Sequence, residues 1–254
     1  MNYYNEIDPF ACQWLDNLMK KGLIAKGFID NRSIEDVNPN ELSEFTQCHF
    51  FAGIGVWSLA LRKAGWSDDE PVWTGSCPCQ PFSQAGKGNG FTDERHLWPS
   101  WFHLIEQCKP STIFGEQVAS KDGLAWLDLV QSDLEAADYT NAAVDLCAAG
   151  FGAPHIRQRL WFVAHPKGKR WVGSENSTAP AGRISTEKRS SVDGYWAQAE
   201  WGECSDGKLR PFESQSFPLV NGTAGRVGRL RAYGNAINAE VATAFIGAYR
   251  ESLC

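Results

Sequence analysis

Two short segments combine residue types that can bind a nucleotide-like ligand and attack a substrate. In Phe51–Gly55, small residues would let a ligand approach backbone N–H groups at the start of a helix, although a tight strand-to-helix turn fits equally well. In Gly75–Ser83, Cys79 stands between prolines, as a nucleophile would. A buried cysteine or half of a metal site are the alternatives. Only one residue separates Cys77 from Cys79, which fits zinc poorly, so we expect no metal.

Two further clusters place charged side chains beside expected strands. Glu116 closes an apolar run, and the carboxyl edge of a parallel sheet is where ligands bind; a helix cap or a solvated glutamate is the ordinary alternative. The segment His155–Arg159 leads into another apolar run, and alternation puts Arg157 and Arg159 on one face. This pair is typical of a salt-bridged edge and, less often, of a contact with an anion or a base.

The elements that must position these residues alternate between strands and helices up to about residue 165. This alternation predicts an α/β fold, with a mostly parallel sheet and helices on both faces. Residues 166–225 lack periodicity and predict a small irregular lobe, which leaves 1–165 and 226–254 as the main domain. We expect strands at 2–7, 28–29, 46–51, 71–74, 112–115, 142–147 and 159–163, and helices from Pro9 (capped by Asp8), at 57–64, 97–108 and 122–136, and from Asn235.

Composition narrows the class of protein. The 254 residues are 43% hydrophobic and 21% charged, which is ordinary globular usage and excludes a disordered chain. No apolar run reaches the roughly 18–20 residues of a membrane span, and the first residues do not resemble a signal peptide. Eight cysteines without a C-x-x-C pair predict reduced thiols and a cytoplasmic protein.

The net charge of −6 argues against a protein that merely coats nucleic acid. The segment 167–189 is the exception, because six basic residues there face two acidic ones, a local charge of +4. We therefore expect any nucleic acid to contact this segment and the Cys79 loop. The basic residues are Lys167, Lys169, Arg170, Arg183, Lys188 and Arg189, and the acidic ones are Glu175 and Glu187.

Taken together, the clusters resemble the DNA (cytosine-5) methyltransferase family over most of the chain. The matching motifs are Phe51–Gly55 (motif I), Pro78–Ser83 (motif IV), Glu116-Gln-Val (motif VI), His155–Arg159 (motif VIII) and Gly234-Asn235 (motif X). The resemblance implies a SAM-dependent methyltransferase with a Rossmann-like fold, where SAM is S-adenosyl-L-methionine, and 166–225 as the target-recognition lobe. It also implies a bacterial or phage-infected cell. Gln117, His155 and Val56 depart from the usual residues, but no reacting group is lost, so we expect an active enzyme.

The activity implied is transfer of a methyl group from SAM to carbon-5 of a cytosine flipped out of double-stranded DNA, through a covalent cysteine adduct, with S-adenosyl-L-homocysteine as the product. An RNA (tRNA) cytosine-5 methyltransferase and an inactive DNA-binding relative remain alternatives, and we expect a monomer. The resemblance implies catalytic roles for Cys79, Glu116, Arg157 and Arg159; cofactor contacts from Glu6, Ile7, Asp30, Phe51, Ala52, Gly53, Ile54, Gly55, Pro78 and Asn235; and DNA contacts from Gln80, Ser83, Lys87, Arg95, Lys169 and Arg170.

The motif order differs from that of the family. Only about twenty residues lie between Gly55 and Cys79, too few for the two strands and one helix of motifs II and III. A matching block lies upstream, where Glu6 closes a strand and could accept hydrogen bonds from a ribose. We therefore expect the order II, III, I, IV, VI, VIII, X. The family has an Asp at the position of Phe28, so either Asp30 substitutes for it or the adenine contact is lost.

Overall fold

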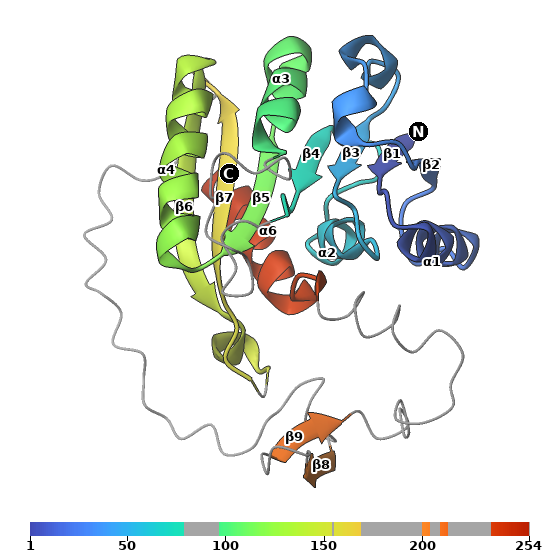
Figure 1. Cartoon of the computed structure of the whole chain (residues 1–254), viewed down its shortest axis with the longest axis vertical. Coiled ribbons are helices and arrows are strands. Elements are labelled where there is room, and N and C mark those ends of the chain that lie inside the picture. The colour runs from blue at the N-terminus through green and yellow to red at the C-terminus, as the bar shows by residue number, and fades with distance from the viewer. Residues whose placement is uncertain (79–96, 154, 169–199, 204–208, 213–234, 254) are drawn as a thin grey trace.

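A seven-stranded sheet forms the centre of the molecule (Figure 1). The computed structural model describes residues 1–78, 97–153, 155–168, 200–203, 209–212 and 235–253. The strand order is β2-β1-β3-β4-β5-β7-β6, and only β7 runs antiparallel to its neighbours, which confirms the mostly parallel α/β fold. The strands are β1 Asn2–Asn5, β2 Gly27–Asp30, β3 Gln47–Phe50, β4 Val72–Gly75, β5 Ile113–Val118, β6 Tyr139–Cys147 and β7 Gln158–Pro166.

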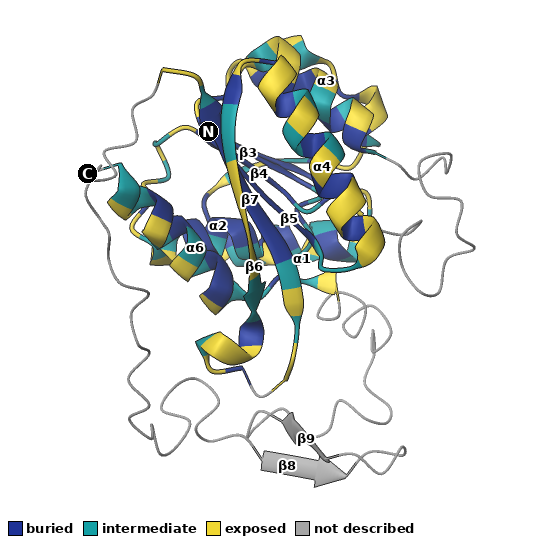
Figure 2. Ribbon diagram, turned by 90° about the vertical axis from the view of Figure 1, so that its left-hand side faces the viewer, coloured by how far each residue is buried: buried dark blue, intermediate teal, exposed yellow. Residues whose placement is uncertain are grey.

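Helices cover both faces of this sheet, as the alternation predicted. Figure 2 shows α3 and α4 on one side and α2 and α6 on the other. The helix α1 shares a buried cluster with Ala52 and Tyr4, and the hydroxyl of Tyr4 donates to Ser58 of α2. The helices are α1 Pro9–Lys20, α2 Val56–Lys63, α3 Trp98–Cys108, α4 Lys121–Ala136 and α6 Ala239–Ser252, with short turns η1 Ile34–Asp36, η2 Pro39–Leu42 and η5 Ala148–Phe151.

Side-chain caps fix where two helices begin. Asp8 Oδ1 accepts hydrogen bonds from the backbone N–H groups of Phe10 (2.8 Å) and Ala11 (3.2 Å), which confirms the predicted start of α1. The prediction for the tail helix was wrong by four residues, because α6 begins at Ala239 and not at Asn235. Asn238 caps this helix, because its Oδ1 accepts a hydrogen bond from Val241 N (3.0 Å). The apolar spacing of the tail continues upstream of Asn238 and led to the earlier predicted start.

Several strands are longer than their apolar patterns predict, and β5 and β6 show the reason. β5 continues to Val118, three residues past its predicted end, because β7 pairs with it through Glu116↔Trp161 and Val118↔Arg159. Glu116 therefore lies inside a strand and not after one. β6 likewise starts at Tyr139 instead of Ala142, since its pairing with β7 extends to Pro166.

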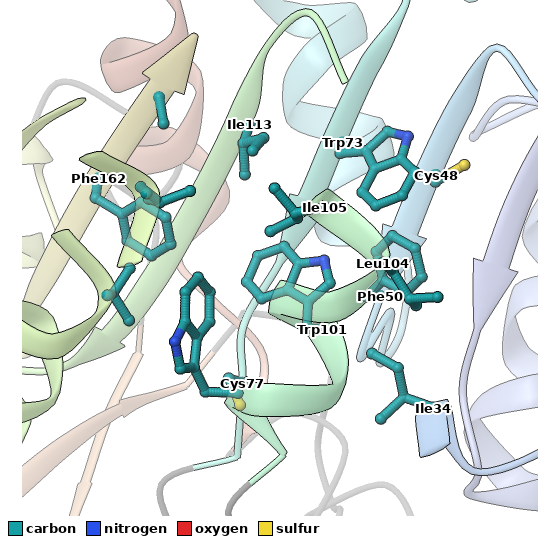
Figure 3. Close-up of a cluster of buried hydrophobic side chains, with 14 of the residues drawn as sticks. Ile34, Cys48, Phe50, Trp73, Cys77, Trp101, Leu104, Ile105, Ile113 and Phe162 are labelled. Carbon is teal, nitrogen blue, oxygen red and sulfur yellow. The ribbon is translucent and has the colours of Figure 1, made fainter. Parts of the chain in front are cut away.

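Large aromatic side chains fill the core between the sheet and the helices α3 and α4 (Figure 3). Trp101 packs so closely on β4 that a Cβ added to Gly75 would lie 2.6 Å from its ring. Phe162 is closer still, 2.1 Å from a Cβ on Gly115 of β5. Glycine is therefore required at both positions. Adjacent residues alternate in side-chain direction, so the residues that follow these glycines face the other side of the sheet, toward α2 and α6.

The chain between the sheet and α6 is described only in part. β8 (Glu200–Glu203) and β9 (Leu209–Phe212) form a two-stranded antiparallel sheet within the expected lobe. Among the residues that the structure describes, no helix is long and apolar enough to cross a membrane. Seven predicted site residues lie outside the described residues, namely Cys79, Gln80, Ser83, Lys87, Arg95, Lys169 and Arg170.

Candidate active site at the carboxyl edge of the sheet

The turn between β3 and α2 bends sharply at the carboxyl edge of the sheet. Phe51, Gly53 and Gly55 all have positive φ angles, of 51°, 55° and 79°. A side chain at Gly55 would be 2.9 Å from Leu15, whereas a Cβ on Gly53 would meet no atom of the described residues within 4 Å. Phe51 adopts a conformation that L-residues rarely take, and such strain is common at ligand-binding turns. The open space above Gly53 would allow a ligand to approach the backbone there.

Glu6 follows the neighbouring strand β1 and joins it to this turn. One carboxylate oxygen accepts a hydrogen bond from Gly53 N (2.6 Å), and the other accepts from Asp8 N (2.9 Å). Glu6 is half-buried, and the next side chain, Ile7, is 67% exposed. A carboxylate and an apolar side chain therefore lie beside the open turn. This combination fits a ligand that carries both hydroxyl groups and a flat apolar ring.

Asp30 ends β2, on the far side of β1, and its carboxylate is held within the protein. It accepts hydrogen bonds from Tyr3 Oη (2.8 Å) and from Arg32 Nη2 (2.6 Å), and its side chain is 3% exposed. Burial opposes ionisation of Asp30, but the hydrogen bonds from Arg32 and Tyr3 outweigh it and lower the pKa. Asp30 is thus separated from the turn by β1, and its carboxylate oxygens are already engaged.

Glu116 and Arg159 form an ion pair across β5 and β7. Arg159 Nε lies 2.9 Å from Glu116 Oε1, and the Glu116 side chain is 9% exposed. Burial raises the pKa of Glu116, although the charges of Arg159 and Arg157 and a hydrogen bond from Ser76 act in the opposite direction. Burial therefore favours the neutral form of Glu116, while the two guanidinium groups favour the ionised form. A carboxyl group in the neutral form can donate a proton as well as accept a hydrogen bond.

Arg157 precedes β7 and connects Glu116 to the tail of the chain. Its Nη2 donates to the backbone oxygen of Ala236 (2.9 Å), next to Asn235, which is exposed. Burial, followed by the charge of Arg159, lowers the pKa of Arg157. Two guanidinium groups therefore lie close to one buried carboxyl group. The sequence placed these residues far apart along the chain, and the structure brings them together.

The segment that leads to Cys79 is anchored to β5. Gln117 Nε2 donates to the backbone oxygen of Cys77 (3.3 Å), and Gln117 Oε1 accepts from Val118 N (2.9 Å). Cys77 is buried, whereas Pro78, the last described residue before Cys79, is exposed. Gln117, a departure from the family pattern, therefore links the strand that carries Glu116 to the segment that carries Cys79.

Sequence reasoning missed three polar residues at this edge. Ser76 and Trp57 contact each other through Trp57 Nε1 and Ser76 Oγ (3.1 Å), and Arg32 pairs with Asp30. None of them lies in a motif position that carries a reacting group. Ser76 could have been found from its place directly after a buried strand, at the same edge as Glu116.

Most of the predicted cofactor residues form one group, and the described catalytic residues form another. Glu6, Asp30 and the turn Phe51–Gly55 follow the neighbouring strands β1, β2 and β3. Glu116 and Arg159 lie two and three strands beyond β3, on β5 and β7. Asn235 is exposed and approaches the second group through Ala236, and not the turn. Ligand and substrate would thus lie side by side along one edge.

Parts of the chain match a known protein family and several of its members. A family model described as "C-5 cytosine-specific DNA methylase" matches residues 68–200, a range that includes Glu116 and Arg159 and begins after the turn Phe51–Gly55. The Type II methyltransferase M.HhaI of Haemophilus parahaemolyticus is 32% identical over 99 residues, which cover 37% of this chain and 30% of that protein. M.AplI of Arthrospira platensis is 29% identical over 180 residues, or 57% of this chain and 52% of the relative.

A solved structure also matches part of the chain. A crystal structure of DNMT2 from Spodoptera frugiperda has a TM-score of 0.47 and 17% identity, and the match covers 69% of this chain and 45% of that one. The chain thus spans between 30% and 52% of the length of the proteins named here.

Proposed function

The chain belongs to the C-5 cytosine-specific DNA methylase family, and on that premise we propose that it transfers a methyl group from SAM to carbon-5 of cytosine in double-stranded DNA. The observation that carries this proposal is the buried Glu116 carboxyl group, paired with Arg159 at the carboxyl edge of the sheet. Such a pair can bind the polar edge of a cytosine ring. Duplex stacking hides both faces of that ring, so the base must be flipped out to react.

In the proposed reaction, the Cys79 thiolate adds to carbon-6 of the base and makes carbon-5 nucleophilic. SAM, when bound, supplies the electrophilic methyl group that carbon-5 takes. Loss of the carbon-5 proton then breaks the bond between carbon-6 and Cys79, which frees the enzyme and leaves 5-methylcytosine. Gln117, through Cys77, would hold the segment that brings Cys79 to the base.

Glu116 would act on the opposite side of the ring. Because burial raises its pKa, it can keep a proton and donate it to ring N3, while its other oxygen accepts from the exocyclic amine. Protonation of N3 makes carbon-6 easier to attack. Arg159 and Arg157 would hold the carbonyl oxygen and a nearby phosphate, where negative charge is present or develops.

Glu6, Ile7 and the turn Phe51–Gly55 would hold SAM. The open space above Gly53, with the Glu6 carboxylate beside it, supports this assignment, since ribose hydroxyls need an acceptor there. The strand order supports the proposed transposition of motifs. β1 lies between β3 and β2, so the upstream block occupies sheet positions that motifs II and III need next to motif I.

DNA would lie across the Cys79 loop and the 166–225 segment, where the local charge of residues 167–189 is positive although the whole chain carries −6. Binding to phosphates by basic side chains releases counterions, so affinity should fall steeply with salt. The proposed DNA contacts at Gln80, Ser83, Lys87, Arg95, Lys169 and Arg170 follow from the family resemblance and this charge.

Methyl transfer from tritiated SAM tests the proposal. We expect label in duplex DNA and not in tRNA, and loss of that label in Cys79→Ala. Label in tRNA alone would replace DNA by RNA as the substrate, and equal label in wild type and Cys79→Ala would remove the nucleophile. Bisulfite sequencing of DNA from cells that express the protein would identify the modified sites.

Cofactor binding has a separate test. Glu6→Ala should weaken binding of S-adenosyl-L-homocysteine by about tenfold or more, because the ribose hydroxyls lose a charged acceptor. Thermal unfolding without ligand should change little by comparison. Asp16→Ala on the exposed side of α1 is a matched control, since it removes a carboxylate from the same region and leaves the turn intact. Unchanged affinity in Glu6→Ala would contradict both the ribose contact and the transposed motif order.

A further inference from the structure

Ser76 directly follows β4, at the position that corresponds to Glu116 on β5. The two strands are parallel neighbours, and Gly75 is the register partner of Gly115. The residues that follow, Ser76 and Glu116, therefore lie side by side at the carboxyl edge. Their side chains leave the sheet on the face toward α2, because Gly75 and Gly115 face Trp101 and Phe162 on the other side.

Trp57 of α2, which packs on this face of the sheet, contacts Ser76. Its ring is 3% exposed, stacks on Phe114 at 6.3 Å between centroids, and meets Trp161 edge-on at 5.5 Å. The indole Nε1 donates to Ser76 Oγ (3.1 Å). The packing of three aromatic rings thus fixes where this donor points.

The chemistry of the indole sets the direction of the whole contact. An indole N–H can only donate, so Ser76 Oγ must accept from it. A serine hydroxyl carries a single proton, which is then free to be donated to another acceptor. Glu116 is that acceptor, since a hydrogen bond from Ser76 acts on its carboxyl group. The hydrogen bonds therefore run in one direction, from Trp57 to Ser76 to Glu116.

We propose that Ser76, oriented by Trp57, is a positioning residue that holds the Glu116 carboxyl group opposite Arg159. Glu116 is then gripped from both sides, by β4 through Ser76 and by β7 through Arg159. This role rests on the proposed function, in which Glu116 must present a proton to ring N3 of the base. A carboxyl group free to rotate would spend less time in that orientation.

The charged groups around Glu116 make the expected direction clear. Arg159 on β7 and Arg157 before it are the cations that act on Glu116, while Ser76 and Trp57 are neutral. The titratable neighbour His155 lies close enough to Arg157 for that charge to lower its pKa, after burial. Ser76→Ala removes a hydrogen bond that lowers the pKa of Glu116, so this pKa should rise further.

The direct test is a carbon-13 NMR titration of glutamate side chains, in which the Glu116 signal is assigned by its loss in Glu116→Gln. We expect a higher pKa for Glu116 in Ser76→Ala and the wild-type pKa in Ser76→Thr, which keeps the hydroxyl. Trp57→Phe should give a smaller rise, because Ser76 is then free to turn. Trp66→Phe is the matched control, since this indole belongs to the same core but donates to Glu70 O.

Some outcomes would overturn the assignment. Identical titration in wild type and Ser76→Ala would show that Ser76 only satisfies the buried indole. Equal shifts in Trp57→Phe and Trp66→Phe would show that any loss of core packing moves the signal. If Ser76→Ala does not fold, Trp57→Phe decides alone, and a wild-type titration in that variant rejects the proposal.

Methyl-transfer kinetics give a second readout. Ser76→Ala should lower kcat by about tenfold, with a change below about twofold in KM for DNA, because a positioned hydrogen bond to the reacting carboxyl is lost. The decline of activity at alkaline pH should move to higher pH. Ser76→Thr should retain wild-type kinetics. A wild-type protein that transfers no methyl group would refute the proposed function, and the NMR titration would still decide the role of Ser76.

Discussion

Asp30 and Glu116 are two buried carboxyl groups at the same edge of one sheet, and each lies beside an arginine. Their pKa values nevertheless move in opposite directions: burial opposes ionisation of Asp30, but its hydrogen bonds prevail and the pKa is lowered, whereas burial prevails at Glu116 and the pKa is raised. An adjacent arginine therefore does not decide whether a carboxyl group is charged.

The difference lies in how many donors surround each group. Asp30 accepts from Tyr3 Oη, from the backbone N–H of Arg32 (3.0 Å), and from three atom pairs with the Arg32 guanidinium. Among the described residues, Glu116 accepts from Arg159 Nε (2.9 Å) and from the hydroxyl of Ser76. Many donors stabilise a permanent charge, and few leave a group that can exchange a proton. This difference fits a structural role for Asp30 and the proposed catalytic role for Glu116.

Glu116→Gln should have the largest effect of the changes that test this comparison. Glutamine matches the shape of the side chain but cannot give a proton to ring N3, so methyl transfer should fall by about 10²–10⁴-fold. Single-turnover transfer of labelled methyl groups would measure this loss. Asp30→Asn serves as the control, and an equal loss in both variants would erase the distinction.

Asp30→Asn should instead lower the free energy of unfolding, by about 2 kcal/mol at neutral pH, because charge-assisted hydrogen bonds are lost inside the protein. The pKa of Asp30 is lowered on folding, so its contribution is fully present above the ordinary value of 3.8 and disappears as pH falls through the lowered value. The free energies of unfolding of wild type and variant, measured in urea, should converge in that acid range. A difference between them that stays constant with pH would contradict an ionised Asp30.

Stability should respond in the opposite sense at Glu116. Because the pKa of Glu116 is raised on folding, the unfolded state ionises first, and wild type loses stability as pH rises from about its ordinary value of 4.5. Glu116→Gln does not titrate, so its advantage in urea unfolding should grow toward neutral pH, to about 1 kcal/mol. If the free energy of unfolding of wild type instead rose relative to that of Glu116→Gln as pH rises, Glu116 would be a structural charge like Asp30.

The smallest effect is expected at Glu41. It pairs with the same Arg32 Nη2 as Asp30 does (2.5 Å), but its side chain is 49% exposed. Glu41→Ala should cost less than about 0.5 kcal/mol, since water and salt screen an exposed pair. Unfolding in high and low salt would measure it. A cost equal to that of Asp30→Asn would mean that Arg32, and not the burial of Asp30, sets the stability of this corner.

Parts of the fold could be predicted from local signals. The start of α1 followed from Asp8 and Pro9, which cap a helix wherever apolar spacing follows them. The ends of β5 and the start of β6 could not be predicted, because pairing with β7 extends both strands beyond their apolar runs. Such pairing depends on residues more than twenty positions away. The start of α6 was missed although Asn238 carried a local signal.

The candidate site divides in the same way. The sequence by itself determined the residue types, since Glu116, Arg159 and the turn Phe51–Gly55 were found from their neighbours along the chain. Only the tertiary structure decided the state of each group. Hydrogen-bond donors lower the pKa of both carboxyl groups, Arg32 and Tyr3 at Asp30 and Arg159 and Ser76 at Glu116. Burial opposes them in both places and prevails only at Glu116, and burial is set by the packing of the whole fold.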